Sequence, residues 1–318
     1  MTISHNKIVG VIGLGMMGAS IVERLLNKDT KIRVYNRSPS KVKSFESKGV
    51  ESFESPCSLA NECDFIITCV TNFESLKEIF FNKQGIVDSN NSQLIIADCT
   101  TIRPDQSLIC YELLKEKKGM TLLSTPVMGG PIDAKNGELL LMVSGDKKAY
   151  ENIYDILFKI SKNIFYLGEK NGISNSVKLA LNLNIAAIYL ALSEGIIFSM
   201  HSGIDPSVYL EIFNLSKLRT SISENKGIKI LKKDFLPSFY LKHMLKDLNL
   251  VIETAKSLQL SLPVTEISQK LFDKANIQGN LKDKDYSAIF QFLDELNKYK
   301  VDKQTKENID CESKSFYI

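Results

Sequence analysis

The first half of the chain alternates short, mostly apolar β-type runs with helical runs. Residues 65–70, Phe-Ile-Ile-Thr-Cys-Val, are nearly apolar throughout, which is typical of a strand covered on both faces. Strands that alternate with helices pair in parallel through crossover connections, so the pattern predicts an α/β domain. The predicted strands are 7–12, 31–35, 64–70, 93–98, 121–124, 139–144 and 164–167, and the helices between them are 16–27, 73–81, 104–117 and 147–160.

The pattern changes after about residue 168, where residues 168–172 are predicted to form a turn. No convincing β-type run follows, and Asp205 and Pro206 have the residue types of an N-cap and a first helical position. The predicted helices are 173–202, 206–216, 239–258, 263–275 and 285–296. We therefore predict an α/β domain over 1–168, an all-helical domain over 169–298 and a polar tail over 299–318.

Composition narrows the class of protein. Of the 318 residues, 44% are hydrophobic and 24% are charged, as in ordinary globular chains. The net charge of +3 gives no strong field for nucleic acid or an anionic membrane, so neither partner is expected. The three His are far apart and the six Cys form no CxxC pair, so no metal site is predicted. With thiols that suit a reducing compartment and no visible targeting signal, we expect a cytoplasmic protein.

The most apolar long segment, residues 179–200, contains Asn182, Asn184 and Glu194. These groups would be costly in lipid, which favours a buried helix over a membrane span.

A glycine motif gives the sharpest local signal. The run Gly13-Leu14-Gly15-Met16-Met17-Gly18 follows a predicted strand and opens a predicted helix. In this context the first glycine permits a tight turn, the second lets the backbone approach a pyrophosphate, and the third allows close helix–strand contact. The helix N-terminus also offers N–H groups to the phosphates. The motif predicts dinucleotide binding; a purely structural turn is the alternative.

The second predicted strand ends at Tyr35 and is followed by Asn36, Arg37 and Ser38. An NAD site usually has an acidic residue here, whereas Arg37 could pair with the 2′-phosphate of NADP. We therefore expect NADP to be preferred over NAD. The alternative is that Arg37 is an ordinary solvated residue and that both cofactors bind.

Further candidates lie where other predicted strands end. Val70 and Thr71, and Thr100 and Thr101, are predicted to reach the carboxyl edge of the sheet, where ligands bind in open α/β folds. For the two threonines, helix capping before Pro104 is the alternative. Gly129 and Gly130 could turn successive N–H groups toward a carboxylate, or could simply form a glycine turn.

Lys178 and Asn182 are four residues apart, so they share one face of the predicted long helix. They could act as a general acid and an orienting amide, or as a solvent-reaching lysine and a structural asparagine. The later pair Lys246-Asp247 is interpreted, taken alone, as a surface charge pair.

Together these segments, with residues 98–104, 126–139, 178–195, 245–248 and 262–263, resemble the β-hydroxyacid dehydrogenase family, which includes 3-hydroxyisobutyrate dehydrogenases and glyoxylate/succinic semialdehyde reductases. The resemblance covers about residues 7–296. It implies a Rossmann-type N-terminal domain, a long interdomain helix over 173–202, and an all-α C-terminal domain that contributes to a homodimer or homotetramer.

The resemblance also implies roles for residues. Lys178 matches the catalytic lysine, with Asn182 beside it, and Lys246 matches a lysine near the cofactor. Thr100, Met128, Gly129 and Gly130 match the region that holds a small carboxylate substrate. Many members have Ser where this chain has Met128, which leaves only backbone donors and a larger apolar wall, and the first of two adjacent asparagines is replaced by Leu181.

The expected reaction is hydride transfer between the cofactor and a small hydroxy acid or its aldehyde or keto acid, with Lys178 as general acid and base. A lysine does this near neutral pH only if its pKa is lowered from about 10.4. An imine reductase-like enzyme and a non-catalytic dinucleotide-binding protein are the alternatives.

Overall fold

The computed structural model describes residues 7–26, 28 and 30–297, so the predicted tail lies outside it. The chain divides into two compact units, Met1–Leu181 and Asn182–Ile318, and the division falls within one long helix. The predicted α/β first part is confirmed. The predicted all-helical second part is confirmed too, because no strand follows residue 166 in the described range. The domain boundaries at 168 and 298 stay predictions.

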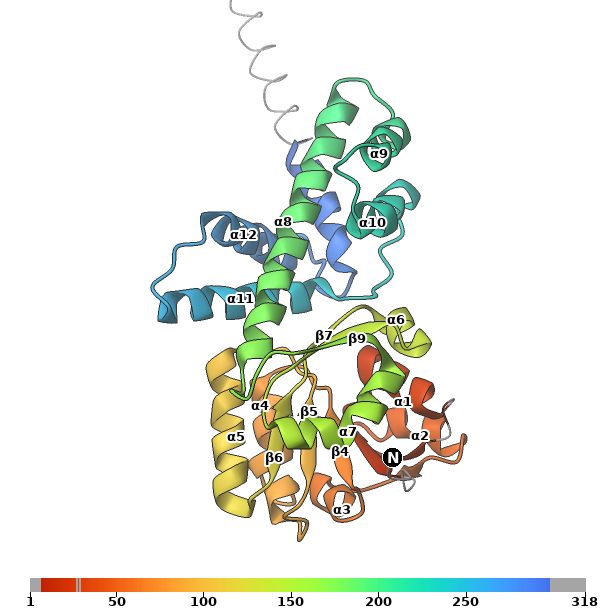
Figure 1. Ribbon diagram of the computed structural model, residues 1–318. Helices are drawn as coiled ribbons and strands as arrows, with labels where there is room; N and C mark the ends of the chain where they lie inside the picture. Colours follow the sequence, from red (N-terminus) through yellow and green to blue (C-terminus); the bar gives the residue numbers. More distant parts are fainter. Residues whose placement is uncertain (1–6, 27, 29, 298–318) are drawn as a thin grey trace, which may run out of the picture. The chain divides into compact units, whose positions relative to one another are not determined.

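The first unit is built on a six-stranded parallel sheet with the order β3-β2-β1-β4-β5-β6 (Figure 1). Its strands are β1 (Ile8–Ile12), β2 (Lys31–Tyr35), β3 (Glu51–Ser52), β4 (Phe65–Thr68), β5 (Ile95–Asp98) and β6 (Thr121–Ser124). Strand β1 pairs with β2 on one side and with β4 on the other, so the direction of strand addition reverses at β1. In open sheets of this kind, ligands bind outside the carboxyl ends of the strands at that reversal.

Alternating residues along the strands pack into two hydrophobic cores, one on each face of the sheet. Val9, Val11 and Ile67 pack under α1 (Met16–Leu26), α2 (Ser40–Glu46) and α7 (Lys147–Ile160). Ile66 and Ile96 pack under α3 (Pro56–Asn61), α4 (Phe73–Phe81) and α5 (Pro104–Lys118). Because both faces are covered, the strands carry apolar residues at nearly every position.

A smaller sheet completes the first unit. Strand β7 (Val127–Met128) pairs antiparallel with β8 (Leu139–Val143), which pairs in parallel with β9 (Ser161–Tyr166). The short helix α6 (Pro131–Asn136) connects β7 to β8, and the 3₁₀ turn η1 (Ile86–Asp88) precedes β5. The last predicted strand, 164–167, therefore begins earlier than expected and ends at Tyr166.

The sequence pattern missed the shortest elements. Strands β3 and β7 have two residues each, which is too short for a periodic signal. Helices α2, α3 and α6 have six or seven residues and also escaped notice, as did α10 (Ser221–Lys232), whose sequence is largely polar. The predicted strands 64–70 and 93–98 are each shorter in the structure, at 65–68 and 95–98.

The second unit packs helices around its own core. They are α8 (Ile173–His201), which begins in the first unit, α9 (Pro206–Leu215), α10, α11 (Leu241–Ser257) and α12 (Pro263–Ile277). The predicted helix 285–296 begins as the 3₁₀ turn η2 (Tyr286–Ala288) and continues as α-helix over 289–297. Tyr189, Met244, Leu248 and Phe272 are fully buried in this core.

Helix α8 is long and apolar enough to cross a membrane by length and composition alone. Within the helical unit, however, its Ala186, Tyr189 and Ile196 are fully buried against the other helices. Packing in a protein core therefore gives a sufficient reason for the apolar sequence.

Buried Asp285 fastens the loop before α11 to η2. Its carboxylate accepts hydrogen bonds from the backbone N–H groups of Ser238 and Ser287, and Lys226 Nζ of α10 lies 2.8 Å from Oδ1. The Lys226 ammonium also lies 4.6 Å from the centre of the Tyr286 ring. This cluster of Asp285, Lys226, Ser238 and Ser287 is called the Asp285 clip below.

Candidate dinucleotide and catalytic site

The loops that follow β1, β2, β4 and β5 bring the predicted binding residues to one edge of the sheet. Gly13–Gly18, called the glycine loop below, connects β1 to α1. Asn36–Ser38 follow β2, Val70 and Thr71 follow β4, and Thr100 and Thr101 follow β5. Since the strands are parallel neighbours, all these residues lie at the same carboxyl edge.

Each of the three glycines of the glycine loop is required for a different physical reason. Gly13 has φ +97°, and a Cβ there would lie 2.2 Å from the carbonyl oxygen of Cys69. A Cβ on Gly18 would lie 1.9 Å from the carbonyl oxygen of Gly13, so α1 can approach the loop only without a side chain. A Cβ on Gly15, by contrast, would meet no atom within 4 Å. Open space above Gly15 is what a bound pyrophosphate requires, so the loop fits a dinucleotide.

This contrast predicts opposite outcomes for two alanine substitutions. We expect Gly18→Ala to impair folding, because the new Cβ collides with backbone that cannot move aside. We expect Gly15→Ala to keep the thermal stability of the wild type and to lose at least about tenfold in dinucleotide affinity. Thermal unfolding followed by circular dichroism and titration of NADPH fluorescence measure the two effects. A Gly15→Ala protein that binds NADPH as tightly as the wild type would contradict this role for the loop.

Asn36 shapes the glycine loop from the neighbouring strand. Its Oδ1 accepts a hydrogen bond of 2.8 Å from the Leu14 N–H, and its Nδ2 donates to the Ser38 carbonyl. Sequence reasoning considered Asn36 only as the residue in place of an acidic ribose ligand and missed this supporting role. Arg37 next to it is 79% exposed and makes an ion pair of 3.2 Å with Glu78. Its guanidinium therefore lies at the surface of the loop after β2, next to Glu78 of α4.

Thr100 connects the loops after β4 and β5. Its Oγ1 accepts a hydrogen bond of 3.2 Å from the Val70 N–H, and its own N–H donates to buried Asp98. The alternative of helix capping is wrong for Thr100 and Thr101, because the N-cap of α5 is Arg103, whose N–H donates to Gln106. Thr100 is thus a buried brace between two loops of the binding edge.

Lys178 lies beside the turn formed by Met128, Gly129 and Gly130, called the double-glycine turn below. Its Nζ is 3.1 Å from Met128 Sδ, and the lysine is half-buried in the second turn of α8. Gly129 has φ +123°, and a Cβ there would lie 2.8 Å from Leu139. The Gly130 N–H already donates to the Asp133 carboxylate at 2.6 Å, so the chain itself engages one of the two predicted anion donors.

Asn182 lies one helical turn after Lys178 and is held by Asp247, whose role in the site sequence reasoning missed. Its Nδ2 donates to Asp247 Oδ2 at 2.6 Å, and Lys246 Nζ is 2.9 Å from Asp247 Oδ1. Asp247 is 2% exposed, so the interpretation of Lys246-Asp247 as a surface charge pair is wrong. The missed signal is that Asp247 lies three residues after Met244 and four before Val251, both of which are buried on α11.

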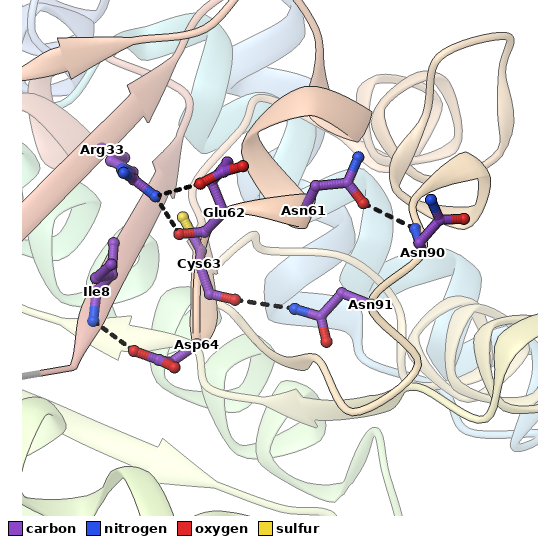
Figure 2. A pocket seen from close by; sticks show the side chains of 8 residues that line it. All are labelled: Ile8, Arg33, Asn61, Glu62, Cys63, Asp64, Asn90 and Asn91. Carbon is purple, nitrogen blue, oxygen red and sulfur yellow. Dashed lines mark hydrogen bonds and ion pairs between the residues drawn. The ribbon is translucent and has the colours of Figure 1, made fainter. Parts of the chain in front are cut away.

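A pocket of about 490 Å³ opens at the opposite, amino-terminal edge of the sheet (Figure 2). Its polar groups pair with one another: the Ile8 N–H donates to Asp64, Arg33 pairs with Glu62, and Asn91 donates to the Cys63 carbonyl. Burial raises the pKa of the Cys63 thiol to about 12, so it stays protonated. This pocket lies away from the glycine loop and offers no nucleophile.

Among the residues that the structure describes, no group of three or more His, Cys, Asp or Glu side chains could hold a metal ion.

Comparison with known proteins agrees with the geometry. Residues 8–168 match the model for the NAD-binding domain of 6-phosphogluconate dehydrogenase, and residues 172–293 match the model described as NAD-binding of NADP-dependent 3-hydroxyisobutyrate dehydrogenase. The uncharacterized oxidoreductase YkwC of Bacillus subtilis is 32% identical over 86% of this chain and 94% of its own length. Glyoxylate/succinic semialdehyde reductase 2 of Arabidopsis thaliana is 28% identical over 90% of this chain and 79% of its own length.

A solved structure shows the same fold. The 3-hydroxyisobutyrate dehydrogenase of Salmonella typhimurium superposes with a TM-score of 0.82, at 22% identity, over 90% of this chain and 99% of that one. The glycine loop, the Rossmann-type unit, the helical unit and the matching family models lead to one conclusion. The chain belongs to the β-hydroxyacid dehydrogenase family, and it is an NAD(P)-binding oxidoreductase of that family.

Proposed function

We propose that the chain interconverts a small hydroxy carboxylic acid and its aldehyde or keto acid, with Lys178 as the general acid and base. The observation that carries the proposal is the position of the Lys178 ammonium, 3.1 Å from Met128 at the double-glycine turn. The lysine, this turn and the glycine loop all belong to the first unit. Reduction of a carbonyl group needs a proton donor next to the place where the carbonyl compound binds.

Nicotinamide, when bound, supplies the hydride for reduction or accepts it in oxidation. Lys178 Nζ donates a proton to the substrate oxygen as that oxygen becomes an alkoxide, and it removes the hydroxyl proton in the reverse direction. Asn182 lies next to Lys178 on α8 as a second polar group, and Asp247 orients its amide. Thr100 fixes the backbone at Val70 and so maintains the edge against which the cofactor would lie.

The glycine loop would hold the pyrophosphate, with Leu14, Met16 and Met17 contributing backbone and side-chain contacts. Asn36, Arg37 and Ser38 would lie near the adenosine ribose, and Val70, Thr71, Thr100 and Thr101 would lie nearer the nicotinamide. The absence of an acidic residue after β2 supports NADP as the preferred cofactor, with NAD as the second.

Arg37→Ala should weaken NADPH binding about tenfold and leave NADH binding unchanged, because only NADPH carries the 2′-phosphate. The Glu78 ion pair is exposed, so a phosphate can replace it at small cost. Fluorescence titration with both cofactors measures the effect, and Glu78→Gln is the matched control, which should not weaken NADPH. Equal losses for NADH and NADPH would count against a 2′-phosphate contact.

The substrate is tested by following NADPH oxidation with a panel of carbonyl compounds. Glyoxylate, succinic semialdehyde, methylmalonate semialdehyde and tartronate semialdehyde represent the proposed class, and a cyclic imine represents imine reductases. Turnover of the imine alone would replace the proposal, and tight NADPH binding with no turnover of any compound would favour a non-catalytic dinucleotide-binding protein.

We also propose that the helical unit forms a homodimer or homotetramer. Several large apolar side chains on it are exposed, among them Phe198, Leu215 and Leu236 at 75% or more. Large apolar side chains exposed in this way support an interface between subunits on this unit. A cytoplasmic location stays a prediction.

A further inference from the structure

The double-glycine turn holds a carboxylate that belongs to the chain itself. Asp133, in the first turn of α6, accepts the Gly130 N–H through Oδ2 at 2.6 Å. A Cβ built on Gly129 would lie 3.1 Å from the same oxygen. The Asp133 carboxylate therefore lies directly against both glycines, where a carboxylate substrate would seek its backbone donors.

Helix α6 keeps Asp133 in this place. Lys135 of α6 makes an ion pair of 2.9 Å with Glu23 of α1. Just after Lys135, the C-cap residue Gly137 has φ +75°, and the Arg24 guanidinium of α1 occupies the space of a Cβ. The C-terminal end of α6 is thus fastened to α1, and the Gly130 N–H holds the Asp133 carboxylate at the N-terminal end.

Two physical effects oppose a second carboxylate at this turn. The Gly130 N–H is already engaged, so a substrate anion can use this donor only by displacing the hydrogen bond of Asp133. Two like charges at close range also repel, and the partly buried site screens them less than water does. Met128 adds no hydroxyl donor that could compensate, since its thioether faces Lys178.

We propose that Asp133 is a specificity-determining residue, which lowers the preference of this site for carboxylate-bearing carbonyl substrates relative to uncharged ones. The proposal rests on the proposed function, because it concerns the substrate that Lys178 protonates. It adds that the Asp133 carboxylate sets how strongly the site distinguishes charged from uncharged carbonyl substrates. A purely structural helix cap would affect stability and leave the ratio of the two substrate classes unchanged.

The test compares succinic semialdehyde with butanal, which has the same number of carbon atoms and no charge. The measured quantity is the ratio of kcat/KM for the acid to kcat/KM for butanal. Asp133→Asn keeps an acceptor for the Gly130 N–H but removes the charge, and Asp133→Ala removes both. We expect the ratio to rise at least about tenfold in both variants, mainly through a lower KM for the acid, with butanal unchanged.

Glu138→Gln is the matched control, because it makes the same change of charge at an exposed carboxylate five positions along the chain. Its ratio should stay within about twofold of the wild type. A change of less than about twofold in both Asp133 variants would overturn the proposal, as would an equal rise in Glu138→Gln.

A binding measurement separates this proposal from the proposed function. Titration of succinate into the NADP⁺-loaded protein, followed by calorimetry, should show at least about tenfold tighter binding in the Asp133 variants than in the wild type. If no variant reduces either carbonyl compound but succinate binding tightens in this way, the proposed reaction fails and the role of Asp133 stands. If succinate binds the variants and the wild type equally, the role of Asp133 is refuted.

Discussion

Replacement of Lys178 by Met should lower turnover by about 10²- to 10⁴-fold, the usual range for loss of a general acid or base. Methionine keeps the length and apolar stem of the side chain but cannot transfer a proton. The dinucleotide affinity should stay within about twofold, because Lys178 contacts the double-glycine turn rather than the glycine loop. Steady-state NADPH oxidation with the best substrate of the panel and NADPH fluorescence titration measure the two quantities.

Lys170→Met is the control for this experiment. Lys170 is an exposed lysine in the turn just before α8, so its loss removes the same charge without touching the double-glycine turn. Its turnover should equal that of the wild type. If Lys178→Met retained most of its turnover, Lys178 would not be the proton donor, and the dinucleotide-binding fold alone would remain supported.

The second large effect concerns stability. Asp285→Asn should lower the free energy of unfolding by about 3–5 kcal/mol, because it leaves the buried Lys226 ammonium without its counter-charge. The Asp285 side chain is fully buried and Lys226 is 12% exposed, so solvent screens this pair little. Urea unfolding followed by circular dichroism measures the loss. The double variant Lys226→Met/Asp285→Asn should recover part of it, since no unpaired charge remains.

Asp283→Asn is the matched control in the same loop. Its ion pair with Lys242 is exposed on both sides, so its removal should change stability little. If Asp285→Asn were no more destabilising than Asp283→Asn, the Asp285 clip would not hold the helical unit together.

The Asp285 clip also predicts the acid sensitivity of the helical unit. Burial by itself raises the pKa of Asp285, but the Lys226 charge and the hydrogen bonds from Ser287 and Ser238 outweigh it and hold that pKa below its usual value. An acid with a lowered folded-state pKa stabilises the fold above its unfolded pKa of about 3.9, and the contribution is lost as the pH falls through the folded value. The free energy of unfolding of the wild type should therefore fall as the pH is lowered through this range. Asp285→Asn should lack this pH-dependent loss.

The pattern of apolar runs and the motifs identified much of this molecule. Strand β2 and helices α4 and α7 lie where the alternation predicted them. The glycine loop has the geometry that its three glycines imply, and Lys178 and Asn182 lie on one long helix. These features are local: strand or helix periodicity, a turn of six residues, and a spacing of one helical turn all follow from neighbours along the chain.

The partners of the site residues were decided by the tertiary structure. Asn182 meets Asp247 across 65 positions, Leu14 meets Asn36 across 22, and Lys178 meets Met128 across 50. No spacing rule connects residues so far apart, because their contact depends on how strands and helices pack. The sequence alone thus determined the order of the longer elements, the dinucleotide motif and the candidate lysine. Only the folded chain decided that Asp247 is buried, that Thr100 is a brace, and that the double-glycine turn already holds the Asp133 carboxylate.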